Sequence, residues 1–472
     1  MALPARIETD SSGPIEVPAG AWWGASTERA RRNFRVSGLR LPARFLRAIA
    51  LIKREAAAVN GELGVLPGAI AEAIAAAAQE IVAGGHADQF PLDVFQTGSG
   101  TSTNMNANEV IANLAIERLG GVVGSKHPVH PNDHVNASQS SNDVVPSALH
   151  VAAYSAIVEE LEPALDGLAA TLGEKARELD AVVKIGRTHL QDAVPIRLGQ
   201  ELSGYQRQVE NGVARLRAAR PRLAELALGG TAVGTGLNAP PGFADRVIER
   251  LARATGHPFV AAPNRFEALA ARDAAVEASG ALRTVAVSLT KIASDLRLMG
   301  SGPRGGLGEL LLPALQPGSS IMPGKVNPVV PESVLQVAAR VIGNDAAIAV
   351  AGLGGIGGNF ELNTMMPLIA HDLLQSIEIL AHAAAMLDRD CVAGIRADPA
   401  RARELVERSL AMVTALAPRI GYDAAAALAQ EAYATGRTVR EVALEKKLLA
   451  PEELAAILDA KKMTDGGVPT PP

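Results

Sequence analysis

The feature that most constrains this chain is a set of three apolar seams, in which apolar residues recur at spacings of three and four. The first seam consists of Tyr154, Val158, Leu161, Leu165, Leu168 and Leu172. The second consists of Leu282, Val285, Leu289, Ile292, Leu296 and Met299. The third, which is slightly less regular, consists of Leu198, Leu202, Tyr205, Val209, Val213 and Leu216. Such a seam faces one partner along a coiled-coil-like contact. The sequence therefore predicts an elongated bundle of long helices, each roughly 40 Å long if it has ~27 residues.

The composition agrees with an all-α fold. Hydrophobic residues make up 48% of the chain but aromatic residues only 3%, so the core is built mainly from Ala, Leu, Val and Ile. Small aliphatic side chains suit closely packed helices, whereas sheets favour β-branched and aromatic residues. Pro163 and Pro221 lie inside the helical patterns and are expected to kink or interrupt their helices, because proline lacks a backbone N–H.

The 472 residues divide into three predicted parts, a number that also follows from ~150 residues per domain. An N-terminal domain, 1–142, begins irregularly with a strand-like piece at 15–17 and continues with helices at about 43–60 and 68–84. The long-helix bundle occupies 143–396. A small C-terminal domain, 397–472, is expected to contain shorter helices at about 398–412, 422–435, 437–447 and 452–460, since Gly421, Gly436 and Pro451 punctuate it.

Charge and cysteine content exclude several classes of protein. The net charge of −5 gives no basic field for nucleic acid or an anionic membrane. The single cysteine, Cys391, excludes an intramolecular disulfide framework. Residues 1–9 are not expected to form a signal peptide, and the apolar stretch 346–358 is too short and glycine-rich to span a bilayer. We therefore expect a soluble protein of the cytoplasm with no nucleic-acid or membrane partner.

Five polar or glycine-rich stretches interrupt the helical patterns. They lie at 96–104, 130–143, 186–192, 229–236 and 318–332. A purely structural coiled-coil scaffold, the alternative suggested by periodicity alone, needs only short turns. Loops that carry hydroxyls, amides, a lysine and a histidine are the ordinary way to hold a small polar ligand.

Nucleotide and metal sites fit these stretches poorly. The segment from Gly318 to Lys325 has five residues between its glycines and Val326 after the lysine, so it is not a phosphate-binding P-loop. The glycines at 229–236 do not match the dinucleotide fingerprint. His127, His130 and His134 have helical spacing, but intervening prolines break the helix that would align them on a metal. We therefore expect no metal, nucleotide or other cofactor.

The remaining interpretation is a site for a small carboxylate. The stretch 138–142 leads into one helix and the stretch 318–327 into another, and helix starts donate backbone N–H groups to anions. Lys325 supplies a point charge for a carboxylate. His189 lies beside polar residues in an otherwise helical region, either as a structural histidine or as an acid/base group. From the residues alone, the inference is a carboxylate ligand handled by His189 and a serine.

At these segments the sequence resembles the class II fumarases of the fumarase/aspartase family. The motifs that carry the resemblance are 98–109, 128–136, 138–143, 186–195, 230–238 and 318–328, and the similarity extends from about residue 5 to about residue 465. Gln139-Ser-Ser-Asn142 and 358–363 look like fumarase rather than aspartase, whereas Pro328-Val-Val-Pro-Glu332 is similar to the aspartase version. The alternative activity is therefore that of an aspartate ammonia-lyase.

The resemblance implies a homotetramer with active sites each assembled from three chains, and a role in the tricarboxylic acid cycle. It implies reversible anti-elimination of water between (S)-malate and fumarate through an aci-carboxylate intermediate. Ser319 would be the carbanion-forming base, and His189, held by Glu332, would handle the hydroxyl or water. The substrate carboxylates would be gripped by Ser99, Gly100, Thr101, Ser140, Ser141, Asn142, Thr188, Ser320, Lys325 and Asn327. A second anion site would consist of His130, Asn132 and Asp133.

Overall fold

The computed structural model describes residues 5–467 and divides the chain into two compact units. Unit 1 contains the chain up to Pro163 together with Ala214–Ala286 and Ala339–Ala381. Unit 2 contains Ala164–Val213, Val287–Ala338 and the chain from His382 onward. The three-part division at residues 142 and 396 stays a prediction. The described residues are predominantly helical, as the small aliphatic composition predicts.

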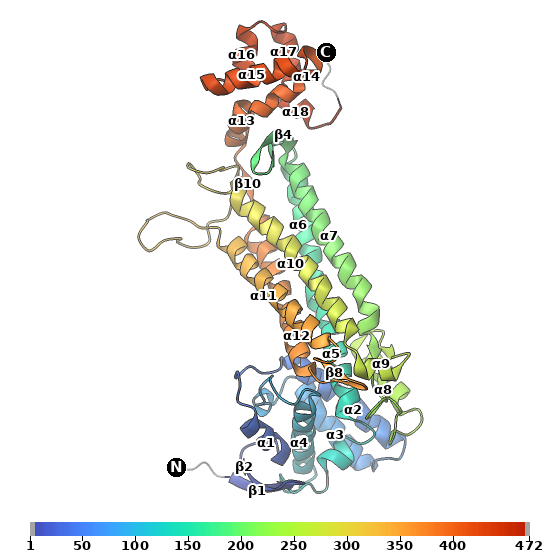
Figure 1. Ribbon diagram of the computed structural model, residues 1–472. Helices are drawn as coiled ribbons and strands as arrows, with labels where there is room; N and C mark the ends of the chain where they lie inside the picture. The colour runs from blue at the N-terminus through green and yellow to red at the C-terminus, as the bar shows by residue number, and fades with distance from the viewer. Residues whose placement is uncertain (1–4, 468–472) are drawn as a thin grey trace. The chain divides into compact units, whose positions relative to one another are not determined.

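Unit 1 is formed mainly by helices of the N-terminal third of the chain (Figure 1). These and later helices of the unit are α1 Ala25–Asn33, α2 Ala43–Glu62, α3 Gly68–Val82, α4 Thr101–Arg118, α5 Ser141–Ala156, α8 Phe243–Thr255 and α9 Arg265–Ala270, with the short turns η1 Ala87–Gln89, η2 Pro131–Val135 and η3 Ile157–Leu161. Its antiparallel pairs are β1 Ala5–Asp10 with β2 Gly13–Pro18 and β8 Gly358–Asn359 with β9 Leu362–Asn363; β5 Glu225–Leu226 runs parallel to β6 Val260–Ala261. The strand predicted at 15–17 and the helices predicted at 43–60 and 68–84 are confirmed.

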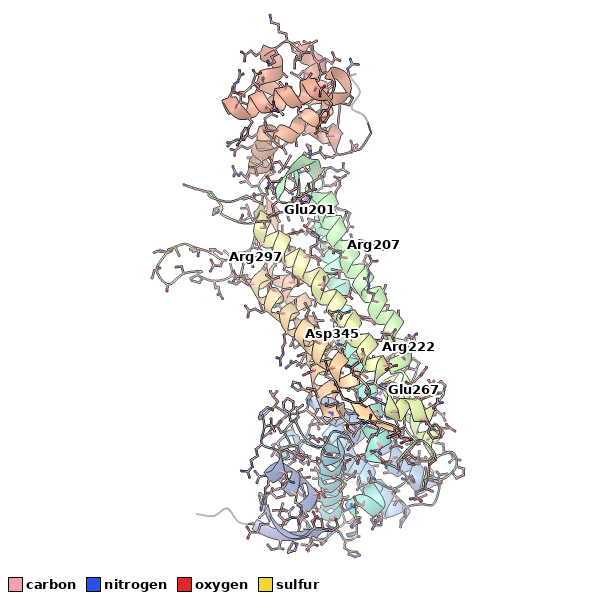
Figure 2. The ribbon with its side chains drawn as sticks, in the orientation of Figure 1. Glu201, Arg207, Arg222, Glu267, Arg297 and Asp345 are labelled. Atoms are coloured by element: carbon pink, nitrogen blue, oxygen red, sulfur yellow. The ribbon has the colours of Figure 1, made fainter. Side chains whose placement is uncertain are left out.

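Five long helices, α6, α7, α10, α11 and α12, carry residues of both units. Their bounds are α6 Glu162–Glu178, α7 Leu198–Leu223, α10 Asp273–Met299, α11 Val329–Gly352 and α12 Met366–Asp390. In unit 2 the Tyr205 hydroxyl of α7 donates to Asp295 of α10 over 2.8 Å. In unit 1 the Ser279 hydroxyl of α10 donates over 2.7 Å to Asp345 of α11, which is labelled in Figure 2. Every residue of the three predicted seams is buried except Val158, which is half-buried.

The two prolines act differently on their helices. Pro163 is the second residue of α6, directly after the π-helical turn η3, so the α-helical pattern is interrupted there as predicted. Pro221 lies in the last turn of α7, two residues before the helix ends at Leu223. The helix therefore continues past Pro221 and is not interrupted there, although this proline has no N–H to donate within the helix.

Unit 2 carries a β-hairpin and the C-terminal helices. The hairpin pairs β3 Val183–Thr188 with β4 Gln191–Arg197, and the short β7 Leu310–Leu311 pairs with β10 Arg396–Ala397. The helices are α13 Pro399–Arg408, α14 Ala417–Ile420, α15 Tyr422–Thr435, α16 Val439–Glu445, α17 Pro451–Ile457 and α18 Ala460–Met463, with 3-10 turns at η4 Val392–Gly394 and η5 Leu410–Ala415. The helix predicted at 398–412 therefore ends early, because Ser409 is extended and its side chain caps the next turn through the Ala411 N–H.

The expectation that His189 lies in an otherwise helical region is wrong. His189 and Leu190 form the two-residue turn between β3 and β4, and both have positive φ, 56° and 60°. Two-residue hairpin turns need positive φ at their centre, and they usually contain Asn or Gly. Neither residue type is present here, so no turn signal is visible at this position.

Candidate active site

The start of α4 holds Ser99, Gly100 and Thr101 in a tight turn of unit 1. The hydroxyls of Ser99 and Thr101 share a hydrogen bond of 2.7 Å. Gly100 precedes the helix with φ of 71°, and a Cβ at this position would lie 2.8 Å from Cγ1 of Val145 in α5. Glycine is required here because both the left-handed conformation and the close approach exclude a side chain. The start of α4 is thereby placed against the start of α5.

Gly98 fixes the same turn to the segment that precedes α12. Its carbonyl accepts from the Met366 N–H at 3.0 Å, and a Cβ on Gly98 would lie 1.6 Å from the Thr364 carbonyl oxygen. We expect Gly98→Ala to cost at least about 1–3 kcal/mol of unfolding free energy, the range typical of overpacking. Urea unfolding measures this. Gly68→Ala is the control, since nothing lies within 4 Å of a Cβ there. Equal stability of the two variants would contradict the close approach.

The start of α5 holds Ser140, Ser141 and Asn142, all half-buried. The Ser140 side chain accepts from the Asn142 N–H, while Asp143 accepts from the Ser140 N–H, a capping box. The Asn142 amide donates to the Ala232 carbonyl at 2.8 Å. Asp143 also accepts from the N–H groups of Gly229 and Thr231, at 3.0 and 2.9 Å. Three polar stretches, at 96–104, 130–143 and 229–236, therefore meet in unit 1.

A buried lysine beneath this helix start was missed from the sequence. Lys53 of α2 is fully buried, and its ammonium donates to Oδ1 of Asn136 at 2.8 Å. The same oxygen accepts from the side-chain amides of Asn104 and Asn108, and Asn104 also donates to the Ser141 hydroxyl at 3.0 Å. Burial lowers the pKa of Lys53 to about 7, against the opposing effect of Asp143. The only signal was a lysine on the face of α2 that also carries Ile49 and Ala56.

The low pKa of Lys53 gives a testable pH dependence. Between about pH 7 and pH 10.5 the unfolded chain keeps this proton and the folded chain does not, so the free energy of unfolding rises with pH. We expect the native protein to gain on the order of 2 kcal/mol from pH 7 to pH 9 relative to Lys53→Met, which lacks the group. Urea unfolding of both proteins at the two pH values measures the difference. Parallel pH profiles would contradict the assignment.

The β3–β4 hairpin of unit 2 holds Thr188 and His189, which are both exposed. Its strand β3 is held by a buried group of charges. Arg187 donates two hydrogen bonds to Glu309, at 2.8 and 3.1 Å, and Glu309 is 1% exposed. Lys184, also buried, lies 3.0 Å from Glu201 (labelled in Figure 2) and 3.7 Å from Glu309. Ionic contacts therefore hold the strands, while the turn projects to solvent.

A long loop between β7 and α11 carries Ser319, Ser320, Lys325 and Asn327 (Figure 1). The Ser319 hydroxyl accepts from the N–H groups of Ile321 and Met322 at 3.2 and 3.0 Å. The Gly318 N–H donates to the Lys325 carbonyl at 2.7 Å, and the Asn327 amide donates to the Gly318 carbonyl at 2.8 Å. An open cavity of about 440 Å³ lies along the loop and is lined by residues that include Ser319 and Lys325.

Glu332 lies in the first turn of α11 and is exposed, as is His189. Among the described residues no hydrogen bond joins these two side chains within the one chain. The structure thus gathers the candidate residues into two sets. Ser99 to Thr101 and Ser140 to Asn142 form one set in unit 1, and the hairpin turn, the long loop and Glu332 belong to unit 2.

The residues of the expected second anion site are adjacent at the start of η2. His130 Nδ1 accepts from the N–H groups of Asn132 and Asp133 at 3.3 and 3.2 Å, and it lies 3.3 Å from Oδ2 of Asp133. Burial lowers the pKa of His130. The backbone N–H of His130 donates to Nδ1 of His134. Within residues 5–467 no group of three or more His, Cys, Asp and Glu side chains is placed to hold a metal ion.

Known proteins that are similar to this chain identify its family. A family model described as "Lyase" matches residues 13–343. "Fumarate hydratase class II" of Nitrosomonas europaea is 54% identical over 460 residues, which cover 98% of this chain and 99% of the relative. "Fumarate hydratase class II 2" of Bradyrhizobium diazoefficiens is also 54% identical, and the match covers 98% of this chain and 97% of the relative. The chain belongs to the class II fumarate hydratase family.

Structural comparison agrees with membership in the class II fumarate hydratase family. The crystal structure of a recombinant class II fumarase from Schistosoma mansoni matches with a TM-score of 0.93 at 40% identity, covering 98% of this chain and 99% of that one. The fold is therefore the fumarase/aspartase fold, as the resemblance implied. A second family model, "Fumarase C C-terminus", matches residues 412–465, which include α15 to α18. Every candidate site residue lies within the lyase match at 13–343.

Proposed function

We propose that the protein catalyses the reversible hydration of fumarate to (S)-malate. Membership in the class II fumarate hydratase family over nearly the whole chain supports a hydro-lyase. The observation that carries the proposal is the Ser319 hydroxyl, which accepts two backbone N–H groups on a solvent-facing loop with Lys325. A small dicarboxylate has two negative charges, and the loop and the helix starts provide the donors to receive them.

The chemical step needs a base and a means to stabilise charge. Removing the C–H proton beside a carboxylate adds negative charge to that carboxylate as an aci-carboxylate, which pre-aimed donors stabilise. A serine is a weak base unless its alkoxide is favoured. The N–H groups of Ile321 and Met322 favour the anionic form of Ser319, because they donate to its oxygen. Lys325 adds a positive charge on the same loop.

His189 is proposed to transfer the proton of the hydroxyl or water on the opposite face of the substrate. Its position at the hairpin turn leaves the ring exposed and free to approach a ligand. A carboxylate beside a catalytic histidine fixes the ring orientation and its basicity, and Glu332 is proposed for this role. Since no hydrogen bond or ion pair joins the two side chains within the described part of one chain, we propose that they meet across chains.

The prediction for His189 separates proton transfer from binding. We expect His189→Asn to lower kcat for fumarate hydration by about 10²–10⁴-fold, the contribution typical of general acid–base catalysis, with a much smaller change in KM. Steady-state kinetics at saturating and limiting fumarate measure both constants. A rise in KM with unchanged kcat would make His189 a binding residue instead.

The remaining residues are proposed to grip the two carboxylates. They are Ser99, Gly100, Thr101, Ser140, Ser141, Asn142, Thr188, Ser320, Lys325 and Asn327. The half-buried hydroxyls at the starts of α4 and α5 support this role, because they lie at helix N-termini, where the helix dipole favours a negative charge. His130, Asn132 and Asp133 are proposed as a second, separate anion site.

A homotetramer with active sites shared by three chains is the proposed assembly. Its support is an apolar face of α11 that one chain leaves exposed, formed by Ala339, Ile342, Gly343, Ala346, Ala349 and Val350. Within residues 5–467, α11 alone is long and apolar enough to cross a membrane by length and composition, and 39% of its most apolar window is buried. One such helix is weak evidence for a membrane, and small residues on one face suit close helix contacts in an oligomer. Sedimentation equilibrium tests the mass.

The distinguishing experiment follows fumarate absorbance with (S)-malate and then with aspartate as the sole substrate. Formation of fumarate from malate alone supports the proposal. Formation from aspartate would favour the aspartate ammonia-lyase, which Pro328-Val-Val-Pro-Glu332 suggests. No change in absorbance with either substrate would favour a non-catalytic helical scaffold. We propose the cytoplasm as the location and the tricarboxylic acid cycle as the pathway.

A further inference from the structure

A small cavity in unit 1 lies apart from every residue assigned above. Its volume is about 230 Å³, below the usual range for drug-sized ligands. The lining residues come from α5, the end of α7, β5, the segment after β6, α9, the link between α9 and α10, and the start of α10. They are His150, Arg222, Glu225, Ala262, Glu267, Ala268, Ala271, Arg272, Asp273 and Ala274. Arg222 and Glu267 are labelled in Figure 2.

Arg272 is a buried cation with unused hydrogen-bond donors. It is only 1% exposed, and its Nη2 donates to the Ala268 carbonyl. Nε and Nη1 of the same guanidinium are buried and have no partner. Burial lowers the pKa of Arg272 to about 10, so the group is still charged at neutral pH. A buried cation without its hydrogen bonds is costly, and a carboxylate accepts two parallel N–H groups from a guanidinium.

The same cavity also presents a hydrogen-bond acceptor and negative charges. Nδ1 of His150 is 2.7 Å from the Glu225 carbonyl, so it carries the proton and leaves Nε2 as an acceptor. Burial and the nearby Arg272 lower the pKa of His150 to about 4, so the ring is neutral. The carboxylates of Glu225, Glu267 and Asp273 also line the cavity, against the two guanidinium groups of Arg222 and Arg272. A dianion would meet three carboxylates, whereas a zwitterion satisfies both kinds of group.

We propose that this cavity binds a small α-amino acid, with its carboxylate on the guanidinium group of Arg272 and its ammonium group on Glu267 and Nε2 of His150. The volume admits only a short side chain. The site is independent of the proposed hydration of fumarate, because none of its residues belongs to that machinery.

Calorimetric titration of the full-length protein tests the proposal, with glycine and L-alanine as probes. We expect both to bind the native protein, and to bind Arg272→Met at least tenfold more weakly. Arg207→Met is the matched control, since the Arg207 side chain is 72% exposed and does not line the cavity. This variant should bind glycine and L-alanine as the native protein does. Acetate, which lacks the ammonium group, should bind more weakly than glycine, and succinate should not bind.

A second variant guards against a folding defect in Arg272→Met. Glu267 is exposed at the cavity, so Glu267→Gln should fold normally; we expect it to weaken glycine binding several-fold and to leave acetate binding unchanged. Absence of glycine and alanine binding to the native protein would overturn the proposal. So would equal binding of glycine and acetate, or full glycine affinity in Glu267→Gln.

Discussion

Replacing Ser319 by alanine is expected to lower kcat for fumarate hydration by about 10²–10⁴-fold or more, because the proposed base is removed. The variant should keep its melting temperature. Ser319 accepts only from the N–H groups of Ile321 and Met322, which lie on an exposed loop. Water replaces the lost hydroxyl there at little cost, unlike at a buried site. Steady-state kinetics and thermal unfolding, measured on the same preparation, give both quantities.

The control for Ser319→Ala is Ser203→Ala, an exposed serine of α7 whose hydroxyl donates to the Gln200 carbonyl. This variant should retain activity. A native sedimentation profile of Ser319→Ala would show that assembly is intact, so that the loss belongs to chemistry. If Ser319→Ala kept near-native kcat, another group would have to be the base.

The second large effect is expected on stability, from Glu309→Ala. Glu309 is 1% exposed and is the carboxylate between Arg187 and Lys184. Its removal leaves Arg187 without its two hydrogen bonds. Buried Lys184 then has Glu201 as its one remaining ion-pair partner among the described residues. Breaking a buried ion pair by removing one partner typically costs about 3–5 kcal/mol, because an uncompensated charge remains. Urea unfolding measures this loss.

Kinetics of Glu309→Ala should also change, because Arg187 immediately precedes Thr188 and His189. A less firmly held β3–β4 hairpin is expected to lower kcat although Glu309 itself touches no substrate in the proposed mechanism. The matched control is Glu407→Ala, which removes a half-exposed ion pair with Arg440. Exposed pairs typically contribute about 0–1 kcal/mol. Equal losses in the two variants would contradict the assigned role of the buried charges.

The long helices were predictable from the sequence, whereas two local features were not. The seam from Leu282 to Met299 repeats over the whole of α10, and burial of such a repeat needs no knowledge of distant residues. The hairpin at His189 was not visible because its turn uses His and Leu at positive φ. Lys53 was not visible either, since a lysine in a helix normally marks the solvent face.

The site was predictable as a set of residue types but not as an arrangement. Ser140 at a helix start and Lys325 in a polar loop suggested a carboxylate ligand without any structure. That 96–104, 130–143 and 229–236 meet depends on contacts such as Asn142 with Ala232, which join residues far apart in sequence. Contacts across chains, proposed for His189 and Glu332, lie beyond any pattern within one chain.

The two hydrogen bonds at the base of the long loop, from Gly318 to Lys325 and from Asn327 to Gly318, close it into a ring. Ser319 and Lys325 therefore lie within one closed segment of the loop. On the proposed mechanism, a substrate that pairs with Lys325 is already in register with its base. Binding of the substrate carboxylate and abstraction of the proton then depend on the same segment of the loop. Substitutions that break either hydrogen bond should therefore change KM and kcat together.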